Sequence, residues 1–244
     1  MDGPKILASY REELAEHLKA YTPPQSIALP ISPWLAMSIL QKAVRRGRRD
    51  LALQAAATLL QDAPDRLWRR LGTVAYEDVG VPSLATVGLV TAALVGKQFR
   101  ATVGGEWAVA SFLVDRLVAA PKNRGADDLY MVCERHPSFR SARQELAHLD
   151  IDRLIVLATG NAELPLRALA AWFALGTDRC PSPYLATRRG KPDRLLDVFC
   201  ETGYQHTAYE LGREAFRKIG LPHCIFVPML LAIRPHVPAE IADD

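Results

Sequence analysis

Apolar residues recur along this chain at intervals of three and four positions, and strictly alternating stretches are rare. Leu67, Leu71 and Val74, for example, share one helical face with basic side chains off that face. No strand–helix–strand alternation accompanies the pattern, so we predict an all-α fold, an array of short antiparallel helices. After a first amphipathic helix, further helices are predicted at 34–45, 51–60, 65–79, 84–95, 106–119, 126–135, 140–149, 162–175, 193–201 and 208–219.

Prolines and glycines divide the chain. Short connections such as 61–64 favour helical hairpins, with Asp50 expected as the N-cap of the helix before that connection. The proline-rich stretch 21–33 reads as an extended linker that docks on its own domain or on a partner. A second break lies at 176–192. We therefore divide the chain into an N-terminal helix and linker (1–33), a helical domain (34–135) and a helical C-terminal region of unknown role (136–244).

One uncharged stretch, Val79–Gly96, approaches the length of a membrane span. Gly80 and Pro82 break its first turn, and Leu84–Val95 is too short to cross a bilayer, so we interpret it as a buried core helix without membrane contact. The N-terminus lacks the basic region and apolar run of a secretory signal, and the cysteines form no CxxC pair. We expect a cytoplasmic protein with reduced thiols.

Four pieces of sequence occur in a recognisable order. They are Ser38–Gly47 with Asp50–Leu53, then Leu67–Leu71, then Ala75–Gly80, then Ala119–Arg124. Together they resemble the C-terminal helical region of the MgsA/RarA replication-associated recombination ATPases, which include the human Werner-helicase-interacting ATPase. The resemblance covers about residues 34–132.

The resemblance implies a domain related to the collar of clamp-loader subunits, one that assembles an ATPase into a tetramer at stalled replication forks. The ATPase module itself is not recognisable, because neither Gly96-Lys97 nor Gly190-Lys191 belongs to a GxxxxGK[ST] loop that could cradle phosphates. We expect no ATP hydrolysis and no cofactor. Gln41 and Tyr76 also depart from the family, which has His and Ser at those positions.

Basic residues cluster at several predicted helix ends and loops, although the chain carries a net charge of only +3. Such clusters can neutralise phosphates, but they also occur as solvated helix ends that complement the helix dipole. Beside Arg69 and Arg70, Trp68 could stack on an unpaired base, although helix packing is the commoner role of a tryptophan. The residues predicted to bind nucleic acid are Lys42, Arg45, Arg46, Arg48, Arg49, Arg69, Arg70, Lys122, Arg124, Arg188, Arg189 and Lys191.

Adjacent carboxylates at Glu77 and Asp78 point about 100° apart on a helix and cannot readily share a proton. We interpret them as a structural ion pair with Arg70 or Arg45, since the end of a helix disfavours negative charge.

No metal or catalytic site is predicted. A zinc site of Cys200, His206, His223 and Cys224 has no recognisable spacing. Cys133 with His136 could make a nucleophile and its base, but a core cysteine is the simpler interpretation, and no GxSxG motif occurs.

Three functional hypotheses follow. The first is a non-enzymatic, homo-oligomeric protein of DNA replication, recombination or repair that contacts DNA through its basic helix ends. The second is a subunit that docks onto a separately encoded ATPase or another protein through helix–groove contacts without touching nucleic acid. The acidic tail 239–244, which lies outside the residues described below, is interpreted as a frayed end, with a docking peptide as the alternative. The third is an enzyme with an unrecognised site around His206 and His223.

Overall fold

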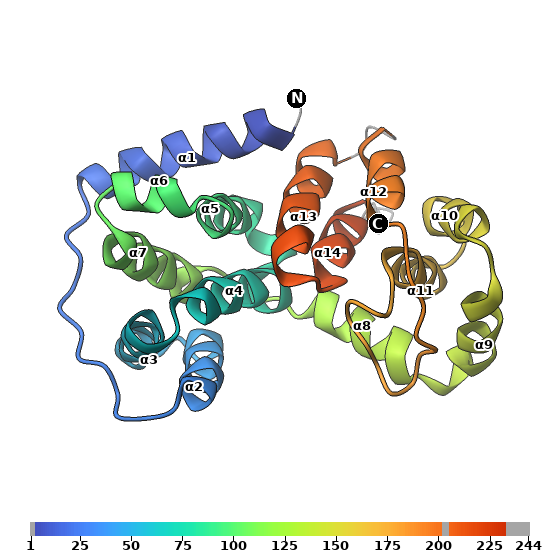
Figure 1. Cartoon of the computed structure of the whole chain (residues 1–244), viewed down its shortest axis with the longest axis horizontal. Coiled ribbons are helices and arrows are strands. Elements are labelled where there is room, and N and C mark those ends of the chain that lie inside the picture. Colours follow the sequence, from blue (N-terminus) through green and yellow to red (C-terminus); the bar gives the residue numbers. More distant parts are fainter. Residues whose placement is uncertain (1–2, 202–204, 233–244) are drawn as a thin grey trace, which may run out of the picture.

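In a computed structural model that describes residues 3–201 and 205–232, every regular element is helical (Figure 1), which confirms the all-α prediction. The α-helices are α1 (Gly3–Lys19), α2 (Pro33–Arg45), α3 (Arg49–Asp62), α4 (Pro64–Val74), α5 (Leu84–Leu94), α6 (Lys97–Thr102), α7 (Glu106–Ala119), α8 (Gly125–Arg135), α9 (Arg140–His148), α10 (Ile151–Thr159), α11 (Leu164–Leu175), α12 (Pro192–Glu201), α13 (His206–Ile219) and α14 (His223–Leu231). The π-helix η1 (Ala75–Val79) and the 3₁₀ helices η2 (Val81–Ser83) and η3 (Pro137–Phe139) lie between them.

Helices α2 and α3 form the first hairpin. Pro33 is the first residue of α2, and the Ser32 hydroxyl accepts a hydrogen bond from the Leu35 amide at 3.3 Å. The prediction for α3 is wrong in one detail, because the helix starts at Arg49 and its N-cap, Arg48, makes no side-chain cap. Asp50 lies within the first turn, where a carboxylate interacts favourably with the helix dipole.

The linker between α1 and α2 lies on its own domain. The Trp107 indole on α7 donates to the Pro24 carbonyl at 2.9 Å, and the Leu29 amide donates to the Thr58 hydroxyl on α3 at 2.8 Å. These bonds satisfy backbone groups that an extended segment cannot pair internally. The linker therefore docks on its own domain, as one of the two predictions has it, and docking on a partner stays a prediction.

Helix α4 does not continue unchanged to residue 79, because its last turn widens into the π-helix η1. Gly80 ends it with φ 54° and ψ −123°, and a Cβ there would lie 3.3 Å from Val227 on α14. Only glycine adopts this backbone conformation readily. The following helix, α5, is buried from Thr86 to Leu94, as expected of a core helix.

Within the described residues, no single helix combines the length and apolar character needed to cross a bilayer. The segments Pro64–Val79 and Val81–Leu94 meet that criterion only as a pair joined across a bend of 110°.

Three α-helices in the described part of the chain were not predicted from sequence: α6, α10 and α14. Helix α10 has an N-cap signal, because the Asp150 carboxylate accepts from the Arg153 amide at 2.8 Å. Helix α14 is apolar on every side and contains Pro228. It therefore lacks the alternation of apolar and polar faces that indicates a helix in the sequence, and proline is unusual inside a helix.

A single large core crosses the expected subdivision near residue 136. Its buried members come from both sides of this position and include Leu113, Trp172 and Phe226. Helix α13 returns to pack against α1, α4 and α5, and α14 packs against α8 (Figure 1). The chain therefore folds back so that its C-terminal helices complete the core of the N-terminal array.

Candidate functional site

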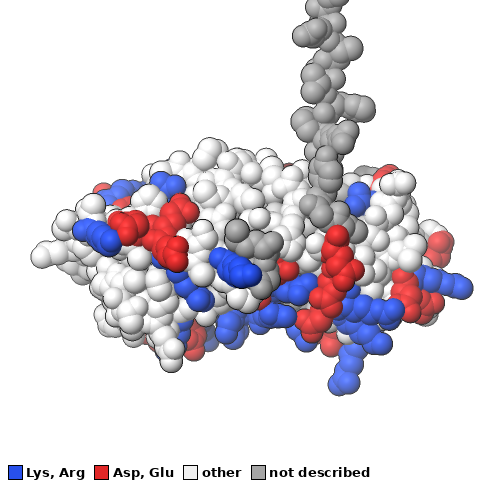
Figure 2. Space-filling model, turned by 90° about the horizontal axis from the view of Figure 1, so that it is seen from above, with Lys and Arg blue, Asp and Glu red and all other residues white. Residues whose placement is uncertain are grey.

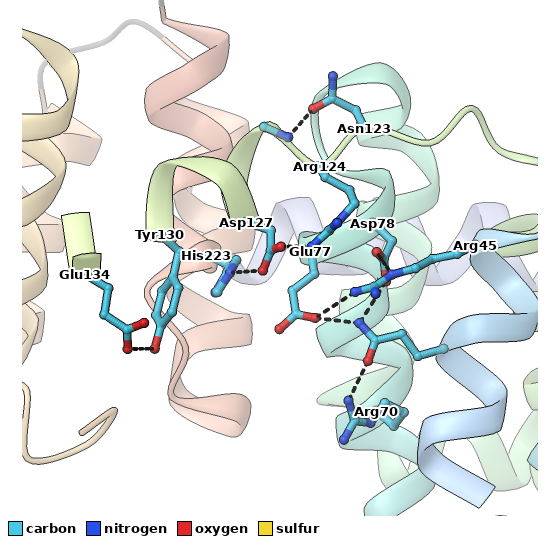
Figure 3. A network of polar contacts seen from close by, with 12 residues as sticks. Arg45, Arg70, Glu77, Asp78, Asn123, Arg124, Asp127, Tyr130, Glu134 and His223 are labelled. Carbon is cyan, nitrogen blue, oxygen red and sulfur yellow. Dashed lines mark hydrogen bonds and ion pairs between the residues drawn. The ribbon is translucent and has the colours of Figure 1, made fainter. Parts of the chain in front are cut away.

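Residues from the first and third of the four sequence pieces meet in a buried polar network (Figure 3). The Asp78 side chain on η1 is fully buried and forms an ion pair with Arg45 on α2. The Gln41 amide donates to Asp78 at 2.9 Å and to Glu77 at 2.6 Å. Burial of a carboxylate is tolerable only with such partners.

The other two pieces join the same network. Arg70 donates to the Gln41 side-chain oxygen at 2.8 Å, and the backbone amide of Asn123 donates to the backbone carbonyl of Asp78 at 2.9 Å. Arg45 is thus the arginine that pairs with Asp78, whereas Arg70 acts through Gln41. The network fastens α2, α4, η1 and the segment before α8 to one another.

A second branch of the network lies on α8 and α14. Asp127 forms an ion pair with Arg124, and its other oxygen lies 3.6 Å from His223 Nε2. The His223 ring and the Arg124 guanidinium hold the pKa of the Asp127 carboxyl below its usual value. Tyr130 stacks on His223 with ring centroids 4.9 Å apart.

The four residues weighed as a zinc site do not form one cluster. Cys200 and His206 lie with Glu210, whereas His223 belongs to the branch just described. Cys224 is fully buried, and burial raises the pKa of its thiol.

Cys133 is a core residue. Its thiol is buried and donates to the Pro165 carbonyl at 3.3 Å, and burial raises its pKa to about 12. His136 is exposed, and its Nδ1 accepts from the Ser138 amide at 3.4 Å. A thiol held protonated in this way is a poor nucleophile, since the thiolate is the reactive form.

The tryptophans have divergent environments. Trp68 is buried under the Arg100 guanidinium, 4.0 Å from the ring centroid, so its faces are not open to a base. Trp34, in contrast, is 71% exposed. It lies in the first turn of α2, next to the exposed Leu35 in the sequence, and Ile27 in the preceding linker is exposed as well.

Two of the five basic residues in the run 42–49 serve as ion-pair partners. Arg45 pairs as described above, and Arg49 contacts Asp115 on α7 at 2.8 Å. The other three are exposed and make no side-chain hydrogen bond or ion pair with the described residues. They are Lys42, Arg46 and Arg48, which we call the basic turn.

The remaining predicted cations also divide into bonded and free groups. Lys122 donates to the Val118 carbonyl at 2.9 Å, and Arg188 donates to the Leu149 carbonyl at 2.7 Å beyond the end of α9. Arg69, Arg189 and Lys191 are exposed and have no side-chain partner in the described part of the chain. On the face shown in Figure 2, Lys and Arg lie among Asp and Glu.

The clearest concave basic surface was not predicted. A groove of about 570 Å³ runs between the end of α8, α9 and the loop before α12. It contains no Asp or Glu among its lining residues. We call it the α9 groove. Its side chains that can recognise an anion or an aromatic ring are Arg135, Arg140, Arg143, His148 and Tyr184.

Several contacts hold these side chains in place. Arg143 is only 9% exposed and donates to the Cys133 and His136 carbonyls at 3.2 and 3.1 Å. Arg135 pairs with the buried Glu134, and its guanidinium lies 5.3 Å from the centroid of the Tyr184 ring. Arg140 is exposed and has no polar side-chain contact with the described residues.

The loop that carries Tyr184 is fixed to α11. Gly176 and Gly190 approach so closely that a Cβ on Gly190 would lie 2.2 Å from the Gly176 amide nitrogen. The buried Thr177 hydroxyl donates to the Ala186 carbonyl at 2.7 Å and accepts from the Arg188 amide at 2.9 Å. These contacts hold the loop in place, and with it the side of the groove that Tyr184 forms.

A dense basic segment, Arg135–Arg143, could have indicated part of the groove, but Tyr184 lies more than forty positions downstream and joins it only through tertiary structure. The fold and the groove together define an all-α protein with a concave basic surface at one end. No family model, curated protein or solved structure matches the chain.

Proposed function

We propose that this chain is a non-catalytic nucleic-acid-binding protein of DNA replication, recombination or repair, and that the α9 groove holds an unpaired stretch of DNA. The observation that carries the proposal is the set of three arginines and a half-exposed tyrosine in a groove without an acidic lining residue. Guanidinium groups bind phosphate oxygens, and an aromatic ring stacks on a base.

The form of the groove favours a single strand over a duplex. Tyr184 is 52% exposed, so part of its ring is accessible to a base, and the Arg135 guanidinium lies 5.3 Å from the ring centroid. Bases of a duplex are stacked on one another and cannot reach such a ring without being unpaired.

The resemblance to the collar-like domains of the MgsA/RarA ATPases supports a place in DNA metabolism. The pieces that carry it meet in the Asp78 network, and this network accounts for their residue types by packing. The proposed DNA contacts therefore lie mainly elsewhere, in the α9 groove and in the basic turn.

Self-association is part of the proposal, with a tetramer implied by the resemblance. Ile27 is 82% exposed, Trp34 is 71% exposed and Leu35 is 41% exposed, all within a short stretch. Large apolar side chains left in water are typical of protein interfaces, where tryptophan often carries much of the binding energy.

The same stretch favours a second function, docking onto a separately encoded ATPase without nucleic-acid contact. Binding to that protein would bury Trp34 and would depend weakly on salt, because apolar contacts are not screened.

Fluorescence anisotropy with labelled single-stranded, duplex and forked DNA separates the two functions. We expect affinity for the single strand to fall steeply with salt and to fall further in Arg140→Gln. Arg116→Gln is the matched control, because Arg116 is an exposed arginine on α7 outside the groove. Absence of DNA binding at low salt would reject the proposal and favour the docking function.

A further inference from the structure

His223 is a buried imidazole without hydrogen bonds. It is the first residue of α14 and is only 3% exposed, and neither Nδ1 nor Nε2 has a hydrogen-bond partner among the described residues. Stacking against Tyr130 fixes the plane of the ring but satisfies neither nitrogen. Buried polar groups are nearly always hydrogen-bonded, so a ring whose nitrogens make no hydrogen bond, with only the Asp127 carboxylate 3.6 Å from Nε2, calls for an explanation.

Two carboxylates converge on this ring from other elements. Asp127 projects from the first turn of α8 and Glu77 from η1, and one ligand atom from each of the three residues lies within 4.8 Å of the other two. The 3.6 Å between His223 Nε2 and Asp127 Oδ1 is long for a hydrogen bond. It is near the spacing of about 3.4 Å between two ligands of a tetrahedral zinc ion.

The other oxygen of each carboxylate is already occupied. Asp127 Oδ2 pairs with Arg124, and Glu77 Oε2 accepts from Gln41 at 2.6 Å (Figure 3). This arrangement matches metal sites, in which outer hydrogen bonds orient the ligating carboxylates. Each carboxylate keeps one oxygen for a cation.

The site is also open on one side. The side chains of Asp127 and Glu77 are 16% and 17% exposed, whereas His223 is sealed in the core. An ion can therefore enter past the carboxylates, and water can complete its coordination.

We propose that His223, Asp127 and Glu77 bind one divalent transition-metal ion, with zinc as the best match. An imidazole nitrogen with two carboxylate oxygens suits a borderline cation better than Mg²⁺ or Ca²⁺, which prefer all-oxygen sites. The ion joins η1, α8 and α14 and so fastens the returning C-terminal helix to the N-terminal array. This inference is independent of the proposed DNA binding.

The test uses the full chain, treated with a chelator and then titrated with Zn²⁺ alone by isothermal calorimetry, with melting temperature followed on the same samples. We expect one ion per chain and a higher melting temperature. His223→Gln and Asp127→Asn should each weaken zinc binding at least tenfold and remove the thermal shift. Two variants are used so that a folding defect in one leaves the other informative.

His206→Gln is the matched control, because His206 belongs to the separate group with Cys200 and Glu210. Its zinc binding should equal that of the parent chain. The proposal is overturned if the parent shows no saturable zinc binding, if His223→Gln and Asp127→Asn both bind normally, or if His206→Gln alone abolishes binding.

Discussion

Arg45 on α2 and Asp78 on η1, 33 positions apart in the chain, form an ion pair in which the aspartate is completely buried. The arginine remains one-third exposed, so the pair lies at the edge of the core. It connects the α2–α3 hairpin to the π-helix η1, which precedes η2 and α5 in the chain.

Removing the aspartate should destabilise the fold. Asp78→Ala removes the buried partner of Arg45, which keeps only Glu77 at 3.9 Å, and one of the two acceptors of Gln41. Breaking a buried pair costs about 3–5 kcal/mol, the lower value applying here because Arg45 reaches solvent. Chemical denaturation measures the loss. Arg46→Ala, which removes an exposed neighbour without a side-chain partner, should change the free energy of unfolding by less than about 0.5 kcal/mol. Equal stability of Asp78→Ala and the parent, with lost DNA binding, would mean that Asp78 acts in binding.

Stability should decline at high pH because of Cys133. Burial raises the pKa of its thiol from 9.0 to about 12, so the unfolded chain loses this proton first. The contribution of the protonated Cys133 thiol to the free energy of unfolding is complete below pH 9. It is lost between pH 9 and 12, at no more than about 1.4 kcal/mol per pH unit. Urea denaturation across this range should show a shallower decline for Cys133→Ala. Parallel declines would contradict the assignment.

Tyr184 should contribute to binding through its ring. Tyr184→Ala should weaken single-stranded DNA binding by about 1–3 kcal/mol, the usual loss for one stacked base, while Tyr184→Phe keeps the ring and most of the affinity. Anisotropy titrations at fixed salt measure both. A loss in Tyr184→Phe equal to that in Tyr184→Ala would assign the effect to the hydroxyl.

Self-association should depend on Trp34. We expect sedimentation equilibrium of the parent chain at micromolar concentration to show an oligomer, and Trp34→Ser with Ile27→Ser to shift it toward monomer. Val156→Ser is the control, because Val156 is also 71% exposed but lies on α10. A monomeric parent chain would refute the oligomer proposal.

Local signals predicted most of the helices, because Pro33, Pro64 and Gly80 mark their ends in the sequence as they do in the structure. An arginine partner for the acidic pair could also be expected, since a buried carboxylate near a helix end requires a cation. Which cations are free could not be predicted. Arg45 and Lys42 look alike in the sequence, and only tertiary packing places one against Asp78 and the other in solvent.

For the same reason, sequence patterns could not predict which residues far apart in the chain lie together in the fold. Asp127 and His223 lie on α8 and α14, and α14 itself was not predicted because it lacks a polar face. Arg140 and Tyr184 share a groove only because the glycine contact between Gly176 and Gly190 folds the loop back onto α11.

The most direct test of DNA binding in the α9 groove is to locate the DNA on the protein. Ultraviolet cross-linking of a single strand to the full chain, followed by mass spectrometry of the peptides, should give adducts on Tyr184 and on the peptide 140–148. Adducts confined to the basic turn, or the absence of any cross-link, would contradict the account.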